Sequence, residues 1–200
     1  MDRRAEIIYA TLELAAENGL RAVSMQQIAD RVGIKKASVY NHFSSRDEII
    51  EAMYSFLRER SKAGLSSGGL DLEELFSGRT LKEILMLTVG NYKKMSTSPE
   101  MLTFYKIIMS ERSLDKSAAE IMAAETERMA GATTMLFYAL QAKGFVDIKN
   151  IETAAYSFAM CINSIINYEC DLAQTGRENT RYTTEGFIDE FCRIYGKERN

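Results

Sequence analysis

Apolar side chains recur at helical spacing along nearly the whole chain, and no stretch alternates apolar and polar residues long enough to predict a β-sheet. Glycines separate the periodic segments, and the only proline stands where a helix is expected to begin. We therefore predict an all-α fold. Helices are expected over residues 3–17, 24–32, 36–42, 45–62, 80–96, from Pro99 onward, 115–143, 151–174 and 184–195.

Local capping signals define the ends of the second and fourth predicted helices. Ser24 followed by Gln27 is a capping box, in which each side chain bonds the backbone N–H of the other residue. Gly33 is placed for the left-handed turn that ends this helix. Ser45 with Glu48 makes a second capping box at the start of the fourth helix.

Residues 62–79 interrupt the helical pattern with glycines and serines, and a single helical turn is expected within them, at 71–76. This composition is typical of a linker. The whole chain has 200 residues, which is enough for one large domain or two small ones.

The second and third predicted helices have the spacing of a helix-turn-helix. Small Ala29 lets the two helices approach closely, Gly33 permits the turn, and Val39 buries the third helix against the second. The outward face of the third helix then consists of polar and basic side chains. These are Lys35, Lys36, Ser38, Asn41 and His42, with Tyr40 beside them.

The charge of this segment differs from that of the rest of the chain. Residues 31–46 hold four of the 25 basic side chains and none of the 28 acidic ones, although the net charge of the whole is −3. Arg31, Lys35, Lys36 and Arg46 are therefore candidates to neutralise DNA phosphates. Asn41 and Ser38 are side chains that can bond base edges in a major groove. A short basic turn on an ordinary helical bundle is the alternative.

At these residues the chain resembles the DNA-binding domain of the TetR family of bacterial transcriptional regulators. The resemblance covers about residues 4–50 and rests on AENGLRAVSM, QQIADRV, GIKKASVYNHF and SRDEI. Family members commonly have GVSKGTLYxHF at the third of these stretches. Lys35 therefore replaces the usual small capping residue, and Ala37 replaces the common glycine.

The resemblance implies an N-terminal three-helix DNA-binding domain, residues 1–46, joined by the fourth helix to a helical effector-binding and dimerisation domain, residues 47–200. It also implies two sets of DNA contacts. The residues at or near the groove would be Lys36, Ala37, Ser38, Tyr40, Asn41 and His42. The candidate phosphate contacts would be Ser24, Gln26 or Gln27, Tyr40 and Arg46. His42 has the alternative of capping the helix or packing beside Phe43.

The remainder of the chain has no comparable motif, but its helices are rich in methionine and aromatic residues, which suit permissive binding surfaces. The residues expected to line an effector site are Phe104, Tyr105, Met109, Met122, Glu125, Met129, Asn163 and Asn167. The alternative is that most of the apolar ones are core. The amides of Asn163 and Asn167 lie on one helical face, so they would bind a ligand, bond across helices or meet a second copy.

The last two helices have apolar faces that are typical of a subunit interface. One face comprises Ala155, Phe158, Ala159, Ile162 and Ile166, and the other comprises Phe187, Ile188, Phe191, Cys192 and Tyr195. Pairing both helices with their copies would give a four-helix bundle about a two-fold axis. A homodimer through these helices is also what the resemblance implies.

Composition excludes several other classes of protein. The chain has one histidine, no Gly-rich phosphate loop, and no CxxC pair, so we expect no metal, no cofactor and no enzymatic activity. The three cysteines are expected to be free and mostly buried. No run of about 18 apolar residues occurs, and the N-terminus lacks an apolar signal-peptide core. A cytoplasmic protein without membrane association is expected.

We therefore predict a DNA-binding transcriptional regulator, specifically a homodimeric repressor that binds a palindromic operator and responds to an unidentified small-molecule effector. Two recognition helices roughly 34 Å apart, or a multiple of that, would match such an operator. The alternative is a helical ligand-binding or interaction module that does not bind DNA.

Overall fold

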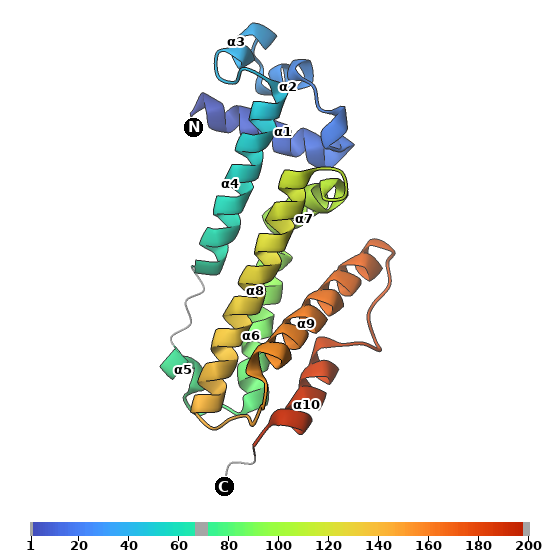
Figure 1. The fold of residues 1–200 in the computed structure, drawn as a ribbon. Coiled ribbons are helices and arrows are strands. Elements are labelled where there is room, and N and C mark those ends of the chain that lie inside the picture. Colours follow the sequence, from blue (N-terminus) through green and yellow to red (C-terminus); the bar gives the residue numbers. More distant parts are fainter. Residues whose placement is uncertain (1, 67–71, 198–200) are drawn as a thin grey trace. The chain divides into compact units, whose positions relative to one another are not determined.

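The structure of the protein is a computed structural model that describes residues 2–66 and 72–197. Its elements are α1 (Arg3–Asn18), the 3-10 turn η1 (Leu20–Ala22), α2 (Met25–Val32), α3 (Lys36–Tyr40), α4 (Arg46–Ser66), α5 (Leu72–Phe76), α6 (Leu81–Ser96), α7 (Pro99–Glu111), α8 (Lys116–Ala142), α9 (Ile151–Gln174) and α10 (Thr184–Tyr195) (Figure 1). The predicted all-α fold is confirmed. Extended pairing within the described ranges is limited to an isolated antiparallel bridge between Val146 and Gly196.

Two predicted helix ends differ from the observed ones by two residues or more. The third helix ends at Tyr40 rather than residue 42, because the backbone N–H groups of His42 and Phe43 both bond the carbonyl of Val39, and the chain tightens into a turn. The fourth helix continues to Ser66, past the predicted end at residue 62. The predicted linker at 62–79 is accordingly shorter. Residues 67–71 of it lie outside the described ranges, and α5 takes the place of the expected turn at 71–76.

The chain divides into two compact units. The first comprises Met1–Gly68 and Thr97–Ala124, and the second comprises Gly69–Ser96 and Glu125–Asn200. The beginning of α8 therefore belongs to the first unit and the rest of it to the second. The predicted boundary at residue 46 separates a DNA-binding part from an effector-binding part, and this functional division stays a prediction.

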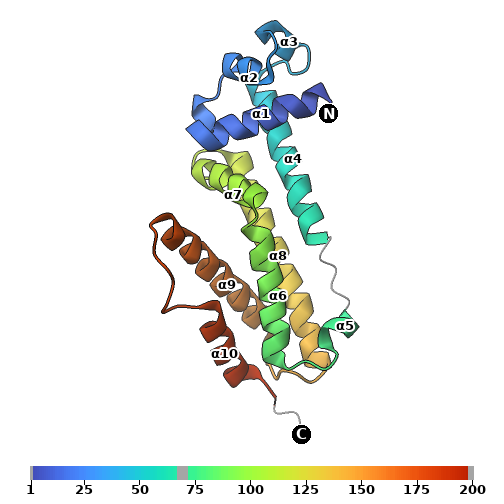
Figure 2. The same cartoon turned by 180° about the vertical axis from the view of Figure 1, so that it is seen from behind.

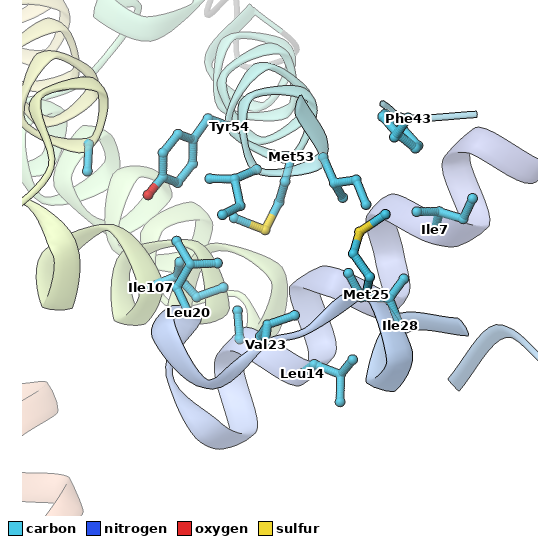
Figure 3. Close-up of a cluster of buried hydrophobic side chains, with 14 of the residues drawn as sticks. Ile7, Leu14, Leu20, Val23, Met25, Ile28, Phe43, Met53, Tyr54 and Ile107 are labelled. Atoms are coloured by element: carbon cyan, nitrogen blue, oxygen red, sulfur yellow. The ribbon is translucent and has the colours of Figure 1, made fainter. Parts of the chain in front are cut away.

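The core of the first unit gathers apolar side chains from α1 to α4, from α7 and from the beginning of α8. Figure 3 shows Ile7, Leu14, Leu20, Val23, Met25, Ile28, Phe43, Met53, Tyr54 and Ile107 of this cluster. Val39 is fully buried in it, as the helix-turn-helix spacing predicted. Burial of such a side chain contributes about 1.5–3 kcal/mol. This anchoring matters because α3, with five residues, is too short to be stable alone.

The second unit is built from α5, α6, most of α8, α9 and α10. Helices α6, α8, α9 and α10 lie side by side in both views (Figures 1 and 2). Phe137, Phe158 and Phe191 form its centre, with ring centroids 4.9–5.3 Å apart. The end of α10 is tied to the loop after α8, since Asp147 N–H bonds the Tyr195 carbonyl at 2.9 Å. Edge-to-face and tilted aromatic contacts of this kind add to the stabilisation from burial.

The apolar faces predicted to form the dimer interface belong instead to this core. Ala155, Phe158, Ala159, Ile162 and Ile166 are all at most 4% exposed within the single chain. On α10, Ile188 and Phe191 are buried, and Phe187, Cys192 and Tyr195 are partly buried against the same cluster. The prediction of these faces was wrong because an apolar stripe shows that a helix buries one side, not which partner covers it. The outward sides of the two helices carry Tyr156, Tyr168 and Ile194, which are 53%, 40% and 54% exposed.

The three cysteines are free, but they are not mostly buried as predicted. Cys161 is exposed, whereas Cys170 and Cys192 are partly buried. Partial burial raises the pKa of both the Cys170 and the Cys192 thiols, which keeps them in the less reactive protonated form.

Candidate nucleic-acid interface

The start of α2 has the predicted capping box. The Ser24 hydroxyl accepts a hydrogen bond from Gln27 N–H at 3.3 Å, and the Gln27 amide oxygen accepts one from Ser24 N–H at 2.9 Å. Gln26 is exposed on the next position and donates to the Asp30 carboxylate at 2.7 Å. The cap therefore occupies the amide oxygen of Gln27 and leaves the side chain of Gln26 on the surface.

The turn between α2 and α3 is the one that the sequence predicts. Gly33 has φ 74° and ψ 32°, in the left-handed region, and its N–H bonds the carbonyls at the end of α2. Ala29 and Val39 are both fully buried, so the two helices meet at a small residue and a branched one. The geometry of a helix-turn-helix is therefore present.

The predicted DNA-reading residues lie on α3 and on the turn that follows it. Lys35, Lys36, Ala37, Tyr40 and Asn41 are exposed, and Ser38 and His42 are partly buried. Lys35 occupies the N-cap position without a side-chain hydrogen bond to the helix, as its departure from the family pattern suggested. No carboxylate lies between Arg31 and Arg46, so nothing on this segment itself repels a phosphate.

The corner between α3 and α4 is held from α1. Arg4 donates from its guanidinium to the His42 carbonyl, and the same group lies 4.0 Å from the centroid of the Phe43 ring. A further nitrogen of Arg4 is 3.8 Å from the Glu48 carboxylate. Sequence reasoning missed this role because 38 positions separate Arg4 from His42.

The second predicted capping box is only half present. The Ser45 hydroxyl accepts from Glu48 N–H at 3.1 Å, but the Glu48 carboxylate turns to Ser44, accepting from its N–H at 2.7 Å and its hydroxyl at 2.8 Å. These bonds to Ser44 lower the pKa of Glu48. The box fails in this half because the preceding serine offers both a backbone and a side-chain donor to the same carboxylate.

Two of the four basic residues of this segment bind protein groups. Arg46 donates from Nε to the Val23 carbonyl at 2.7 Å and from one terminal nitrogen to the Leu20 carbonyl at 2.5 Å. Arg31 pairs with Glu13 at 3.0 Å and with Glu17 at 2.7 Å. The phosphate contact expected of Arg46 stays a prediction, but the described structure gives its guanidinium other acceptors.

The eight residues predicted to line an effector site divide between the two units. Phe104, Tyr105, Met109 and Met122 belong to the first unit, and Glu125, Met129, Asn163 and Asn167 belong to the second. Phe104 is 1% exposed and lies in the core of the first unit, with Tyr105 and Met122 packed against that core. Met109 and Asn167 are exposed. Core packing therefore accounts for three of the first four residues.

A partly buried polar cluster occurs in the second unit. The hydroxyl of Tyr92 on α6 donates to the amide oxygen of Asn163 on α9 at 3.3 Å. Glu125 is 9% exposed and pairs with Arg128 at 2.6 Å, one helical turn along α8. Burial, with the Glu125 charge, raises the pKa of Tyr92 to about 12. The sequence analysis named Glu125 and Asn163 but missed Tyr92. The signal that could have found it is a polar hydroxyl placed three positions after the buried Val89, on the same face of α6.

The fold and this exposed α3 face define a helix-turn-helix regulator of the DNA-binding class. Residues 7–53 match the N-terminal model of the bacterial regulatory proteins of the tetR family, and residues 83–197 match the C-terminal domain of AefR-like transcriptional repressors. The chain belongs to the TetR family of bacterial transcriptional regulators.

Named relatives match from about a quarter to just over half of the chain. The HTH-type transcriptional repressor KstR2 of Mycobacterium tuberculosis is 39% identical over 51 residues, 26% of each chain. The HTH-type transcriptional activator FasR of Mycolicibacterium smegmatis is 38% identical over 52 residues, 26% of this chain and 24% of that one. The chain thus spans about a quarter of the length of these two relatives.

Solved structures are similar over nearly the whole chain. A TetR-family regulator from Mesorhizobium loti has a TM-score of 0.67 at 19% identity, covering 98% of this chain and 100% of that one. A transcriptional regulator from Saccharomonospora viridis, solved in complex with choline, has a TM-score of 0.68 at 17% identity and covers 98% of both chains. At these identities the similarity shows the fold. In the described ranges, no helix combines the length and the apolar character that crossing a membrane requires.

Proposed function

We propose that the protein is a ligand-responsive homodimeric repressor that binds a palindromic operator through α3. The observation that carries this proposal is the exposed, carboxylate-free surface of α3, set on a buried Val39 and a left-handed Gly33. Lys35 and Lys36 would meet phosphates, and Asn41 and Ser38 would meet base edges. The repressor name of several relatives supports the sign of regulation, although FasR is named an activator.

Mobility shift with the DNA upstream of the protein's own gene tests this proposal. The expected result is a complex that resists competition by unrelated duplex, together with a protected site of two-fold symmetry. Equal competition by specific and unrelated duplex would leave the alternative, an interaction module without sequence-selective DNA binding.

The dimer interface that we propose uses the outward sides of α9 and α10, because their inward sides are buried in the chain itself. Tyr156 and Tyr168 on α9 and Ile194 on α10 are large apolar residues left on the surface of the last two helices. Their partner would be a second copy, which lets two α3 helices read two half-sites. Ile194→Glu should shift the mass in light scattering from dimer to monomer, whereas Leu114→Glu, at an exposed loop position, should leave it unchanged. An unshifted Ile194→Glu dimer would place the interface elsewhere.

The polar end of the effector site that we propose is the cluster of Tyr92, Glu125, Arg128 and Asn163. It offers hydrogen-bond donors and acceptors beside the apolar core of the second unit, and this combination is typical of small-molecule sites. A ligand would shift the regulator between two arrangements only through its different affinity for each.

A thermal-shift screen of small molecules against wild type and Tyr92→Phe tests the cluster. A compound that stabilises wild type and releases operator DNA should stabilise Tyr92→Phe less, since one hydrogen-bond donor is lost. A matched control is Tyr182→Phe, whose ring is exposed on the loop before α10. Equal stabilisation of wild type, Tyr92→Phe and Tyr182→Phe would show that the effector site does not include the Tyr92 hydroxyl.

A further inference from the structure

The guanidinium of Arg46 has its nitrogens distributed among protein acceptors. Nε and one terminal nitrogen bond the carbonyls of Val23 and Leu20, and the other terminal nitrogen is 3.6 Å from the Asp47 carboxylate. The side chain is one-third exposed. Two of its five N–H donors thus bond carbonyls, and a phosphate that approached the other terminal nitrogen would compete with the Asp47 carboxylate.

The two carbonyls that Arg46 binds lie at the entry to the helix-turn-helix. Leu20 begins η1, and Val23 is the residue immediately before the Ser24 cap of α2. Both side chains are buried in the core of the first unit. Arg46 stands at the first position of α4, so its two bonds join the beginning of α4 to the beginning of α2 across 23 and 26 positions of sequence.

We propose that Arg46 is a positioning residue for DNA binding and not a phosphate contact. It fixes the angle at which α2 enters the helix-turn-helix relative to the first turn of α4. Arg4 acts in the same way at the other corner, where it binds the His42 carbonyl and covers Phe43. With both corners held, α2, α3 and the first turn of α4 move together. The inference rests on DNA binding by α3 and concerns what supports that helix.

Substitution by lysine separates the two roles. Lysine keeps the positive charge and binds phosphate well, but its single ammonium cannot reproduce a planar fork that reaches two carbonyls. A phosphate contact predicts that Arg46→Lys is close to wild type. A positioning role predicts that Arg46→Lys resembles Arg46→Ala.

The first measurement uses the free protein. Hydrogen exchange of the backbone amides over residues 20–25 should become at least about tenfold faster in Arg46→Lys, as a local opening is made easier. The matched control is Lys36→Ala, an exposed cation on α3, which should leave exchange in this segment unchanged. Unchanged exchange in Arg46→Lys overturns the proposal whether or not the protein binds DNA.

The second measurement is the salt dependence of binding to a short mixed-sequence duplex, where phosphate contacts dominate. Lys36→Ala should lower the slope of log affinity against log salt by about 1. Arg46→Lys should lower the affinity without changing the slope. Arg46→Ala should also lower the affinity and leave the slope unchanged. A slope lowered by about 1 in Arg46→Ala, with wild-type affinity in Arg46→Lys, would establish a phosphate contact and overturn the proposal. If Arg46→Ala does not fold, Arg46→Lys alone gives both measurements.

Discussion

Gly33 allows a quantitative test of the turn between α2 and α3. Its φ is 74°, and a Cβ built there meets no heavy atom within 4 Å. The penalty of Gly33→Ala is therefore backbone strain, about 1–2 kcal/mol for an L-residue in the left-handed region. Restriction of the unfolded chain by Ala offsets about 0.4–1 kcal/mol of this. The free energy of unfolding should fall by roughly 1 kcal/mol.

Gly90 provides a matched position with the opposite expectation. It lies inside α6, is exposed, lacks a positive φ, and a Cβ there also meets nothing within 4 Å. Gly90→Ala should therefore raise the free energy of unfolding by about 0.5–1 kcal/mol. Gly33→Asn should be less damaging than Gly33→Ala, because Asn tolerates the left-handed region.

Urea denaturation of the three variants and wild type measures these differences, provided that the slope against urea is unchanged. For a chain of this size, 1 kcal/mol corresponds to a shift in Tm of about 2–4 °C. Loss of stability at both glycines, or equal losses for Ala and Asn at Gly33, would refute the assignment of the effect to backbone strain.

Three further outcomes are expected. Val39→Ala removes two buried methyl groups and should lower the free energy of unfolding by about 2 kcal/mol in chemical denaturation, and a negligible loss would contradict its burial. Asn41→Ala should relax discrimination between operator variants in competition binding, and unchanged discrimination would remove it from the base-reading set. The hydrogen bond from Arg31 lowers the pKa of Glu17, so the stabilisation of this pair is present above the ordinary Glu pKa and lost as pH falls through the lowered value. Arg31→Gln should therefore be less stable than wild type at neutral pH, with a deficit that shrinks in acid unfolding; a deficit independent of pH would contradict the pairing.

The helix-turn-helix was predictable because its signals are local. A capping box spans four residues, a left-handed turn selects glycine, and Val39 must be buried if α3 is to pack on α2. Each of these features depends on neighbours within a few positions. The same locality explains why the ends of most helices were predicted closely, and why α4, which has no stop signal at residue 62, was not.

The partners that side chains contact across long stretches of sequence were not predictable. The basic character of Arg46 is visible in the sequence, but whether a guanidinium meets a phosphate or the carbonyls of residues 20 and 23 depends on the folded corner. The apolar stripes of α9 and α10 show burial without naming the partner. Tyr92 and Asn163 are 71 positions apart, and the apolar periodicity of their two helices does not indicate that their side chains form a hydrogen bond.

The ion pairs of Arg31 with Glu13 and Glu17 and the carbonyl bonds of Arg46 engage two of the four cations of residues 31–46, whereas Lys35 and Lys36 lie exposed on the DNA-reading side. Affinity for arbitrary DNA rises with the number of phosphates that a protein neutralises, so a surface with few free cations binds bulk DNA weakly. A chromosome offers about 10⁶–10⁹ competing sites, and each weakly held copy returns quickly to solution. Few copies of the regulator would then be sequestered away from its operator, and a modest cellular supply would be enough to keep that operator occupied.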